Sequence, residues 1–418
     1  MSSMLDFNVM CNKCKNDAKR ILILGAGVAQ ENLIRVSKEL GYFTIVCDKR
    51  QGMPGEKMAD RYYHVDYMNK ESICNIAKIE DIDGVISNSE PAMISVSYLV
   101  DYLGLPGNSV QSIQHLLSKT NFRNLQKDIG LFSPNSFEVF DYNDLIEKLN
   151  LIKYPVIIKP SESSGSRGAA RFDYYDEEKM KNAFAECKMF SRNGCVTLEE
   201  YILNAGSDVY NADVFVVNGK VLWDGWYGGK RTDLLPMVPM AKILPPIITN
   251  ENKDRIEETV ERLLEESGVS LGEFNVETFI TDNNEVFVIE INPRQAGDEI
   301  PKLIFEHSGI DYTKLLVSLT VNDTEYYKSI INQKRECNYI TLQVVFPHKS
   351  GVYKGLYIHE DLKNYVCWIT EFAKAGTFVH AARNAEDSVA YVDLKFDDRE
   401  LQVLYSNDIE KYIYPIIS

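Results

Sequence analysis

The segment FNVETFITDNNEVFVIEINPR, residues 274–294, constrains the fold more than any other stretch of this chain. Two strand-like runs of apolar and β-branched residues flank a short polar sequence, which is the pattern of a β-hairpin. With a two-residue loop at 283–284, Asp282 pairs with Glu285, and each further pair keeps the same sum of residue numbers. That register predicts that Glu277 lies directly opposite Glu290, with Cβ atoms roughly 4.5–5.5 Å apart.

The same hairpin predicts a metal site. Asn292 follows Glu290 by two residues and therefore points to the same face of the sheet. Opposed carboxylates destabilise a bare hairpin, and a divalent cation that prefers oxygen ligands, Mg²⁺ or its substitute Mn²⁺, removes that cost. Glu277, Glu290 and Asn292 are the expected ligands, and Arg294 lies just beyond them, where it can stabilise a phosphoryl group in transfer. A solvated hairpin face with incidental acids, or a slipped register, stays open as the alternative.

A second motif, VIIKPSESSGSRGAARF at residues 156–172, predicts a phosphate site. Lys159 ends a β-branched run, and a loop rich in Ser and Gly follows it at 161–168. In the Walker pattern G-x-x-x-x-G-K-[ST], the lysine follows the glycine-rich loop. That pattern is absent here, and the lysine stands before the loop instead. Small residues let the backbone N–H groups approach phosphate oxygens closely, which favours a flexible lid over nucleotide phosphates rather than a plain surface turn.

Residues 20–107 alternate between strand and helix patterns, which predicts a parallel α/β module. A dinucleotide site is the first hypothesis for its opening turn, GAGVAQ, with Asp48 at the position of a ribose-binding acid. Gln30 stands where the third glycine of that fingerprint belongs, so the turn is expected to bind something else or nothing. The expected elements are strands at 20–24, 43–47 and 84–88 and helices at 30–40 and 91–103.

The remaining residues predict two further regions. A helix at 118–130 and strands at 156–159 and 196–202 precede a hairpin that turns at Asn218–Gly219, and a helix follows at 253–268 with its apolar face at i, i+4, i+7, i+8 spacing. Residues 338–418 are β-rich. The fold class is therefore α/β and α+β. The expected organisation is a tail at 1–18, an α/β domain at 19–115, a central domain at 116–330 with a lid lobe at about 130–200, and a C-terminal lobe at 331–418.

Composition excludes several classes of partner. A chain of 418 residues predicts two or three domains, and its net charge of −16 argues against nucleic acid and against anionic membranes. No apolar run reaches the ~18 residues that span a bilayer, and the N-terminus has no apolar signal core, so the cytoplasm is the expected location. Cys11 and Cys14 form a C-x-x-C without a second pair at zinc spacing, and we expect reduced thiols in a tail.

Taken in order, these motifs resemble those of the ATP-grasp superfamily, which includes biotin carboxylase and the L-amino acid ligases. IKPSESSGSRGA looks like the family's strand lysine and glycine-rich lid, and EINPR looks like its metal signature. The resemblance covers nearly the whole chain and implies a biotin carboxylase-like architecture of three domains with a pre-ATP-grasp domain first. Because QAGDEIP follows the metal signature, the likeness is greatest to the carboxylate–amine ligase and L-amino acid ligase branch.

The resemblance also implies a nucleotide site. SKTNFRNLQKDIGL looks like the segment with the first phosphate-binding lysine, LEEYI like the adenine-contacting linker and AGSDVY like the ribose segment. Glu199 would accept the exocyclic amine, and the backbone of the linker would meet the ring edge. The lid here is SESSGSRG rather than a glycine run, and the ribose acid is Asp rather than Glu. The implied ATP-binding residues are Lys119, Lys159, Ser163, Ser164, Gly165, Ser166, Glu199, Glu200, Ile202 and Asp208.

The implied activity is that of an ATP- and Mg²⁺-dependent ligase that joins a small carboxylic acid to an amine or amino acid through an acyl phosphate. Arg294 and Lys159 are the expected catalytic residues. GWYGGKRTD at 225–233 suggests a substrate loop, with Lys230 and Arg231 on a carboxylate and Trp226 lining the pocket, while Asp298 would receive the amine. The alternatives are a carboxylase or formate-type ligase of nucleotide metabolism, a non-catalytic nucleotide-binding protein and a nicotinamide oxidoreductase. A homodimer is one option for its assembly.

Overall fold

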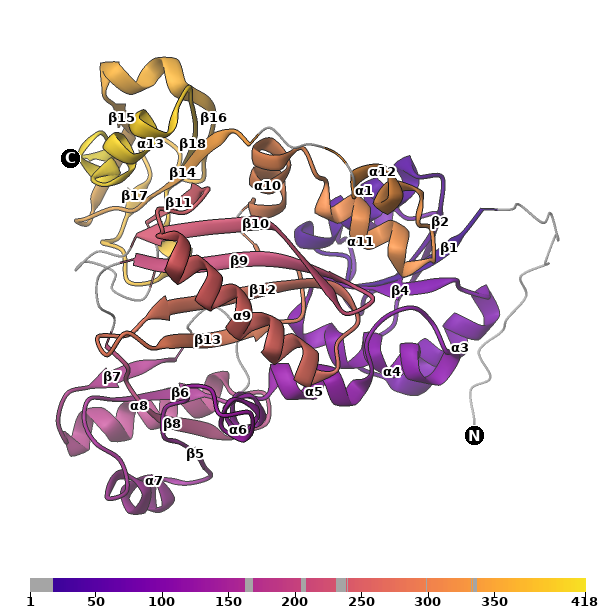
Figure 1. The fold of residues 1–418 in the computed structure, drawn as a ribbon, viewed down its shortest axis with the longest axis horizontal. Coiled ribbons are helices and arrows are strands. Elements are labelled where there is room, and N and C mark those ends of the chain that lie inside the picture. The colour runs from indigo at the N-terminus through magenta and orange to yellow at the C-terminus, as the bar shows by residue number, and fades with distance from the viewer. Residues whose placement is uncertain are drawn as a thin grey trace.

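The computed structural model describes residues 18–161, 168–203, 208–230, 238, 240–297, 299–331, 333 and 337–418. These residues form an N-terminal α/β module, a long antiparallel sheet covered by helices, and a smaller lobe that extends from one end of that sheet (Figure 1). None of the helices within these ranges is long and apolar enough to cross a membrane.

The N-terminal module is a parallel four-stranded sheet in the order β3-β2-β1-β4, which confirms the predicted α/β class. Its central strands are almost entirely buried because helices cover both faces, as is usual for parallel sheets. The strands are β1 (Arg20–Leu24), β2 (Phe43–Cys47), β3 (Arg61–Tyr63) and β4 (Gly84–Ile86), and the helices are α1 (Val28–Glu39), α2 (Pro54–Met58), α3 (Lys70–Glu80), α4 (Met93–Leu103) and α5 (Val110–Leu117).

The polar groups at the turn after β1 bond to one another. Gln30 accepts a hydrogen bond from the Gly27 amide at 3.0 Å and donates one to Asn88 at 2.6 Å. The buried carboxylate of Asp48 accepts from the Ala26 amide at 3.0 Å and from the Arg50 guanidinium at 2.7 Å. These bonds occupy the carboxylate of Asp48, the group that would bind the ribose in a dinucleotide site.

An antiparallel sheet of eight strands crosses the middle of the molecule in the order β13-β12-β9-β10-β11-β14-β18-β16. Helix α9 (Asn250–Ser267) covers one face, and its buried residues Ile256, Val260, Leu263 and Leu264 are those of the predicted apolar face. The tight turn at Asn218–Gly219 is also confirmed, with φ of 51° and 76°. The strands are β9 (Asp208–Val217), β10 (Lys220–Lys230), β11 (Ala241–Leu244), β12 (Leu271–Ile280), β13 (Val286–Asn292), β14 (Tyr339–Val345), β16 (Val366–Glu371) and β18 (Ala390–Phe396).

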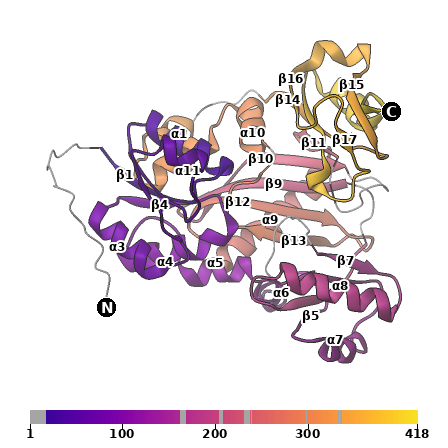
Figure 2. The ribbon, with the colours of Figure 1, turned by 180° about the vertical axis from the view of Figure 1, so that it is seen from behind.

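Two smaller units flank this sheet (Figures 1 and 2). The lid lobe has its own four-stranded sheet, β5-β8-β6-β7, its own apolar core, and the helix α6 (Lys119–Asp128) at its entrance. It consists of β5 (Ser136–Val139), α7 (Tyr142–Leu149), β6 (Val156–Pro160), β7 (Ala170–Phe172), α8 (Glu177–Phe190) and β8 (Val196–Glu200). At the C-terminal end, β14, β18 and β16 continue the eight-stranded sheet, while β15 (Gly351–Ile358), β17 (Phe378–Val379), β19 (Ile413–Ile417) and α13 (Arg399–Ser406) surround them.

Helix α11 (Tyr312–Thr320) packs on the N-terminal module, although about 290 residues separate it from β1. Figure 2 shows it beside α1. Val317 and Val321 join the apolar core of β1 and α1, and Asn32 donates to Thr313 at 3.0 Å. A Cβ on Gly84 would lie 2.2 Å from the Thr320 carbonyl oxygen, so only glycine fits there. The neighbouring helices are α10 (Ile300–Ser308) and α12 (Glu325–Ile330).

Candidate functional site

The hairpin β12–β13 places the two predicted metal carboxylates opposite each other. Glu277 pairs with Glu290, as the sequence predicts, and Asn275 pairs with Asn292. The predicted two-residue loop is wrong. Thr281, not Asp282, pairs with Glu285 across a three-residue loop. Asn284 closes that loop with φ of 59°, a left-handed conformation that Asn tolerates.

A β-bulge explains why the predicted pair forms in spite of the longer loop. Near the loop, Thr278 pairs with Val288, but the next residue, Glu277, pairs with Glu290. Ile289 is therefore the extra residue of a bulge. The loop gains one residue and the bulge absorbs one, so the register beyond Glu290 is the one that a two-residue loop would have given.

The metal residues lie on the sheet face that α9 does not cover. Val276, Val288 and Ile291 pack in the core beneath α9, and their neighbours Glu277, Glu290 and Asn292 therefore point to the opposite face. Asn292 donates to Glu290 at 2.8 Å. Two carboxylates and an amide oxygen on one patch are the oxygen donors that Mg²⁺ prefers, so the residues fit this ion.

Cations surround this patch in the ligand-free protein. Burial raises the pKa of Glu290, but the charges of Lys119, Lys159 and Arg294 and the bond from Asn292 outweigh burial, so the pKa is lowered. Lys119 is the first residue of α6 and Lys159 lies in β6, as the phosphate-site prediction requires. Three cations therefore favour the ionised form of the Glu290 carboxylate.

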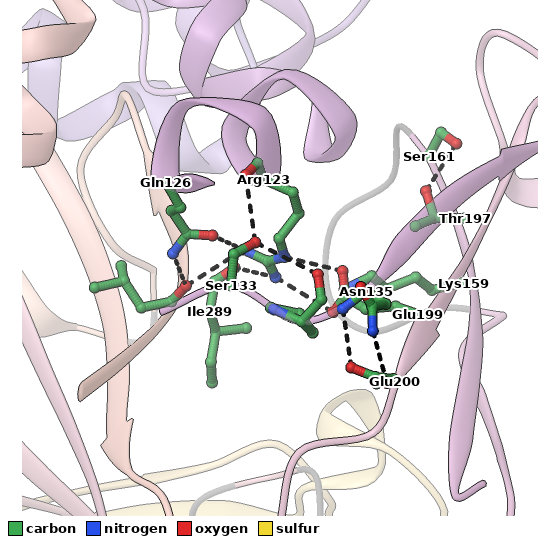
Figure 3. A network of polar contacts seen from close by, with 12 residues as sticks. Arg123, Gln126, Ser133, Asn135, Lys159, Ser161, Thr197, Glu199, Glu200 and Ile289 are labelled. Carbon is green, nitrogen blue, oxygen red and sulfur yellow. Dashed lines mark hydrogen bonds and ion pairs between the residues drawn. The ribbon is translucent and has the colours of Figure 1, made fainter. Parts of the chain in front are cut away.

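Lys159 belongs to a buried ion-pair network with Glu199 and Arg123 (Figure 3). The Lys159 ammonium donates to Glu199 Oε1 at 2.7 Å, and Arg123 Nε donates to Glu199 Oε2 at 2.9 Å. Burial and the nearby charges of Arg123 and Lys119 lower the pKa of Lys159 to about 8 against the pull of Glu199. Although burial raises the pKa of Glu199, Arg123 and Lys159 lower it to about 2. Both oxygens of Glu199 thus hold cations, which differs from the free acceptor expected for an exocyclic amine.

Sequence reasoning missed Arg123, which is only 2% exposed. Its guanidinium also donates to Gln126 at 2.9 Å and to the Ile289 carbonyl at 2.8 Å, and it lies 5.0 Å from the ring centre of Phe287. Arg123 of helix α6 therefore links the bulge of β13, at Ile289, to Glu199 of the lid lobe. No local pattern in SKTNFRNLQ marks this arginine, because its partners are 76 and 166 residues away.

An apolar patch beside this network suits a flat ring. Ile202, which follows the linker strand β8, packs against the buried side chains of Val209, Phe279 and Phe287. Glu200 accepts bonds from Asn135 at 3.0 and 2.9 Å, so its side chain fixes the linker. The aromatic residues of this patch were also missed, although Phe279 follows Glu277 by two residues and therefore shares its face. Phe287 joins that face only because of the bulge at Ile289, which the sequence does not reveal.

Several predicted residues lie outside the described residues. These are Ser163, Ser164, Gly165, Ser166, Arg231 and Asp298, together with Cys11 and Cys14. Asp208 begins β9, and its side chain is outside the description as well. Lys230 ends β10 opposite Ala241 and Asp208.

The prediction that Trp226 lines the substrate pocket is wrong. Trp226 is 5% exposed, packs in the core beneath α9 and donates to Glu257 of that helix at 2.9 Å. It stacks on Trp223 with ring centres 5.1 Å apart. Because side chains alternate along β10, its neighbour Tyr227 points to the opposite face, the one that carries Glu277, where its hydroxyl accepts a bond from Asn275.

Arg294 lies where three regions of the chain meet. It follows β13 directly, and its Nη1 donates to the Gln295 carbonyl at 2.8 Å. Its Nη2 is 3.9 Å from Glu90 of the N-terminal module, and Glu90 also accepts a bond from Arg192 of the lid lobe at 2.8 Å. Lid, N-terminal module and metal strand therefore share one buried carboxylate.

Comparison with known proteins identifies the domain. Residues 152–302 match the family described as ATP-grasp domain. The chain is 24% identical over 360 residues to the carbamoyl phosphate synthase large chain of Vibrio cholerae, and spans about a third of the length of that relative (32%) and 81% of itself. It is 24% identical to the formate-dependent phosphoribosylglycinamide formyltransferase of Bacteroides thetaiotaomicron, over 66% of this chain and 70% of the relative.

Solved structures share the fold over almost the whole chain. An L-amino acid ligase from Bacillus licheniformis superposes with a TM-score of 0.76 at 16% identity, covering 96% of this chain and 99% of that one. A phosphoribosylglycinamide synthetase from Anaerococcus prevotii superposes with a TM-score of 0.69 at 22% identity, covering 96% and 100%. With the lysine strand and the opposed carboxylates in place, residues 152–302 of this chain match the ATP-grasp domain, and the chain as a whole shares the fold of these solved structures.

Proposed function

We propose that this protein is an ATP- and Mg²⁺-dependent ligase that joins a small carboxylic acid to an amine through an acyl phosphate and releases ADP and phosphate. One observation carries the proposal: Glu277 and Glu290 oppose each other with Asn292 on the same face, and the charges of Lys119, Lys159 and Arg294 converge on Glu290. Carboxylates for a metal and cations for phosphates within one patch are the requirements of phosphoryl transfer.

The residues divide the work between binding and charge stabilisation. Lys119 and Lys159 hold the nucleotide phosphates, and the apolar patch beside Ile202 receives the base. Glu277, Glu290 and Asn292 would hold Mg²⁺, which would supply neutralising charge for the transferred phosphoryl group. Arg294, 19% exposed, faces the same region and stabilises the charge that develops on the transferred group.

The chemistry then needs no protein nucleophile. A carboxylate oxygen of the acid attacks the γ-phosphorus, and the bond from that phosphorus to the ADP oxygen breaks. The amine nitrogen attacks the carbonyl carbon of the acyl phosphate, phosphate leaves, and the nitrogen gives up a proton to solvent. Positioning of the reactants supplies most of the rate.

The size of the neighbouring cavity supports a small acid. A cavity of about 50 Å³, room for a few water molecules, lies between the N-terminal module and the start of β12. Ser87, Asn108 and Arg294 contribute polar groups to its otherwise mainly apolar lining. An acid of a few heavy atoms fits this space beside Arg294.

A second candidate uses formate or bicarbonate as the acid. The match to a formate-dependent phosphoribosylglycinamide formyltransferase over 70% of that relative favours it. The same nucleotide and metal residues would serve, and only the acid and the amine would differ.

The test is ³¹P NMR of the protein with Mg²⁺ and ATP, pooled carboxylic acids, and pooled amines present or omitted. ADP and phosphate that form only with both pools support the ligase, and formate or bicarbonate alone as the acid pool tests the second candidate. AMP and pyrophosphate would overturn the acyl phosphate. ATP left intact with every pool would favour a protein that only binds nucleotide.

A matched pair of variants ties the activity to the site. Glu290→Gln removes a metal carboxylate and should lower kcat/KM at least 100-fold, about 3 kcal/mol of transition-state stabilisation. Glu285→Gln, an exposed change directly after the loop of the same hairpin, should leave turnover unchanged. Equal turnover in the two variants would remove Glu290 from the mechanism.

A further inference from the structure

Two buried carboxyl groups lie behind the metal site, and the mechanism above does not use them. Asp213 of β9 and Glu273 of β12 are 0% and 2% exposed. Both point to the same face of the sheet as Glu277, because Asn275, which pairs with Asp213, alternates with the core residues Phe274 and Val276. They are diagonal neighbours on paired strands, since Asp213 pairs with Asn275 and Glu273 pairs with Phe215. Two carboxyl groups buried side by side disfavour two negative charges, so one of them is expected to hold a proton.

The hydrogen bonds that Asp213 and Glu273 accept from their neighbours indicate which of the two carries that proton. Asp213 accepts two bonds, from Asn275 Nδ2 at 2.8 Å on Oδ1 and from the Ala296 amide at 2.9 Å on Oδ2. Glu273 accepts one bond, from Gln295 Nε2 at 2.8 Å on Oε2, and its buried Oε1 meets no donor among the described residues. A proton on Glu273 Oε1, donated to Asp213, satisfies both groups. Burial and the charge of Asp213 agree with this, since they raise the pKa of Glu273 well above its usual value.

Both carboxyl groups hold the residues that follow Arg294. Ala296 is tied to Asp213 through its backbone, and Gln295 is tied to Glu273 through its side chain, which also donates to Thr313 of α11 at 2.9 Å. Strand β13 ends at Asn292, so these bonds, rather than strand pairing, fix the turn in which Arg294 lies.

We propose that Asp213 and Glu273 share one proton and act as positioning residues that hold the 293–296 turn, and with it Arg294, over the metal carboxylates. The effect on turnover rests on the proposed function, since that is where Arg294 receives its role. The shared proton itself rests on the burial of both groups, their places on neighbouring strands and the donors that surround them.

Two isosteric variants separate this inference from a general need for buried acids. In Glu273→Gln, the amide NH₂ donates to Asp213 and the amide oxygen accepts from Gln295, so every bond of the neutral acid is kept. In Asp213→Asn, one acceptor oxygen becomes a donor that faces either Asn275 or the Ala296 amide, so one bond is lost. We expect kcat within about threefold of wild type for Glu273→Gln and a loss of about 10- to 100-fold for Asp213→Asn.

The readouts distinguish positioning from a structural role. ADP affinity, measured by calorimetry, should stay within about twofold in both variants, because the bonds of both groups lead to Asn275, Gln295 and Ala296 and not to the nucleotide lysines. Infrared spectroscopy should show the band of a neutral carboxylic acid in wild type, and that band should vanish in Glu273→Gln. Should Asp213→Asn fail to fold, Gln295→Ala cuts the tether to Glu273 without a mismatched donor and should also lower kcat while ADP affinity holds.

Three results would overturn the inference. These are the absence of the neutral-acid band in wild type, its persistence in Glu273→Gln, and full kcat in both Asp213→Asn and Gln295→Ala. The infrared and ADP measurements need no ligase turnover, so they stand or fall separately from the proposed function.

Discussion

At the scale of single residues, the network around Glu199 shows what the sequence could predict and what it could not. Lys159 is predicted from its place at the end of a β-branched run, and Glu199 from the resemblance of LEEYI to an adenine-contacting linker. Arg123 could not be predicted, because its burial depends on partners supplied by β8 and β13. The same holds for the role of Glu199, whose carboxylate is used by two cations.

The lowered pKa of Lys159 predicts a pH dependence of nucleotide affinity. Lys159 has a pKa of about 8 without ligand, and phosphates bind its protonated form. The dissociation constant for ADP should therefore be flat below this pKa and rise as the pH increases through 8, by up to about tenfold per pH unit. Calorimetric titrations between roughly pH 6.5 and 9.5 measure this. Lys159→Arg, which stays charged throughout, should abolish the rise, and an equal rise in that variant would assign it to another group.

Removal of the Arg123 guanidinium should destabilise the protein strongly. Arg123→Met leaves Glu199 buried with one cation instead of two, and breaking such a buried pair costs about 3–5 kcal/mol. Denaturant unfolding should show the loss as a lower midpoint. Arg35→Met is the matched control, because Arg35 and Glu39 are more than half exposed and such pairs contribute about 0–1 kcal/mol. Similar midpoints for the two variants would show that the buried pair contributes no more than the surface pair.

At the scale of elements, the β12–β13 hairpin was predicted in register but not in detail. Period-two alternation sets which residues share a face, and it is readable in sequence. Whether a loop has two residues or three depends on backbone conformations at Asn284 and Ile289 that the sequence does not specify. The extra residue in the loop and the extra residue in the bulge cancel, so the predicted pairing of Glu277 with Glu290 is confirmed.

One-residue deletions on the two sides of Glu290 should have opposite outcomes. Deleting Asn283 shortens the loop but leaves the pairing from Thr281 and Glu285 onward unchanged, so turnover should stay within about twofold. Deleting Ile291 leaves Glu290 opposite Glu277 but moves Asn292 opposite Val276 and turns it toward α9, so turnover should fall at least 100-fold. Assays of both deletions, with circular dichroism to confirm folding, decide the matter, and an active Ile291 deletion would refute the role given to Asn292.

At the scale of the whole molecule, the parallel module and the apolar face of α9 followed from periodicity, whereas the contacts between regions did not. Glu90 contacts Arg192 and Arg294, which follow it in the sequence by 102 and 204 residues. No local pattern records such a meeting. The continuation of the central sheet by β14, β18 and β16 was likewise not apparent from a β-rich C-terminal sequence.

The bond between Arg192 and Glu90 predicts a link between lid closure and the N-terminal module. Arg192→Ala should release the lid lobe, and amide hydrogen exchange at the C-terminal end of α8 and the residues after it should accelerate about fivefold, the equivalent of roughly 1 kcal/mol. Arg171→Ala is the control, because Arg171 pairs with Asp173 inside the lobe. Acceleration of equal size in both variants would mean that the bond to Glu90 does not restrain the lid.

Helix α11 has a consequence for synthesis of the chain. The core of β1 and α1 is closed by Val317 and Val321, and the notch at Gly84 is filled by Thr320. Domains generally fold in order as they emerge from the ribosome, which synthesises the chain at about 5–20 residues per second. Here the first module emerges with an apolar face that its own residues do not cover, and its missing helix follows roughly 10–40 s later at that pace. The nascent chain therefore presents a natural binding surface for a chaperone during translation.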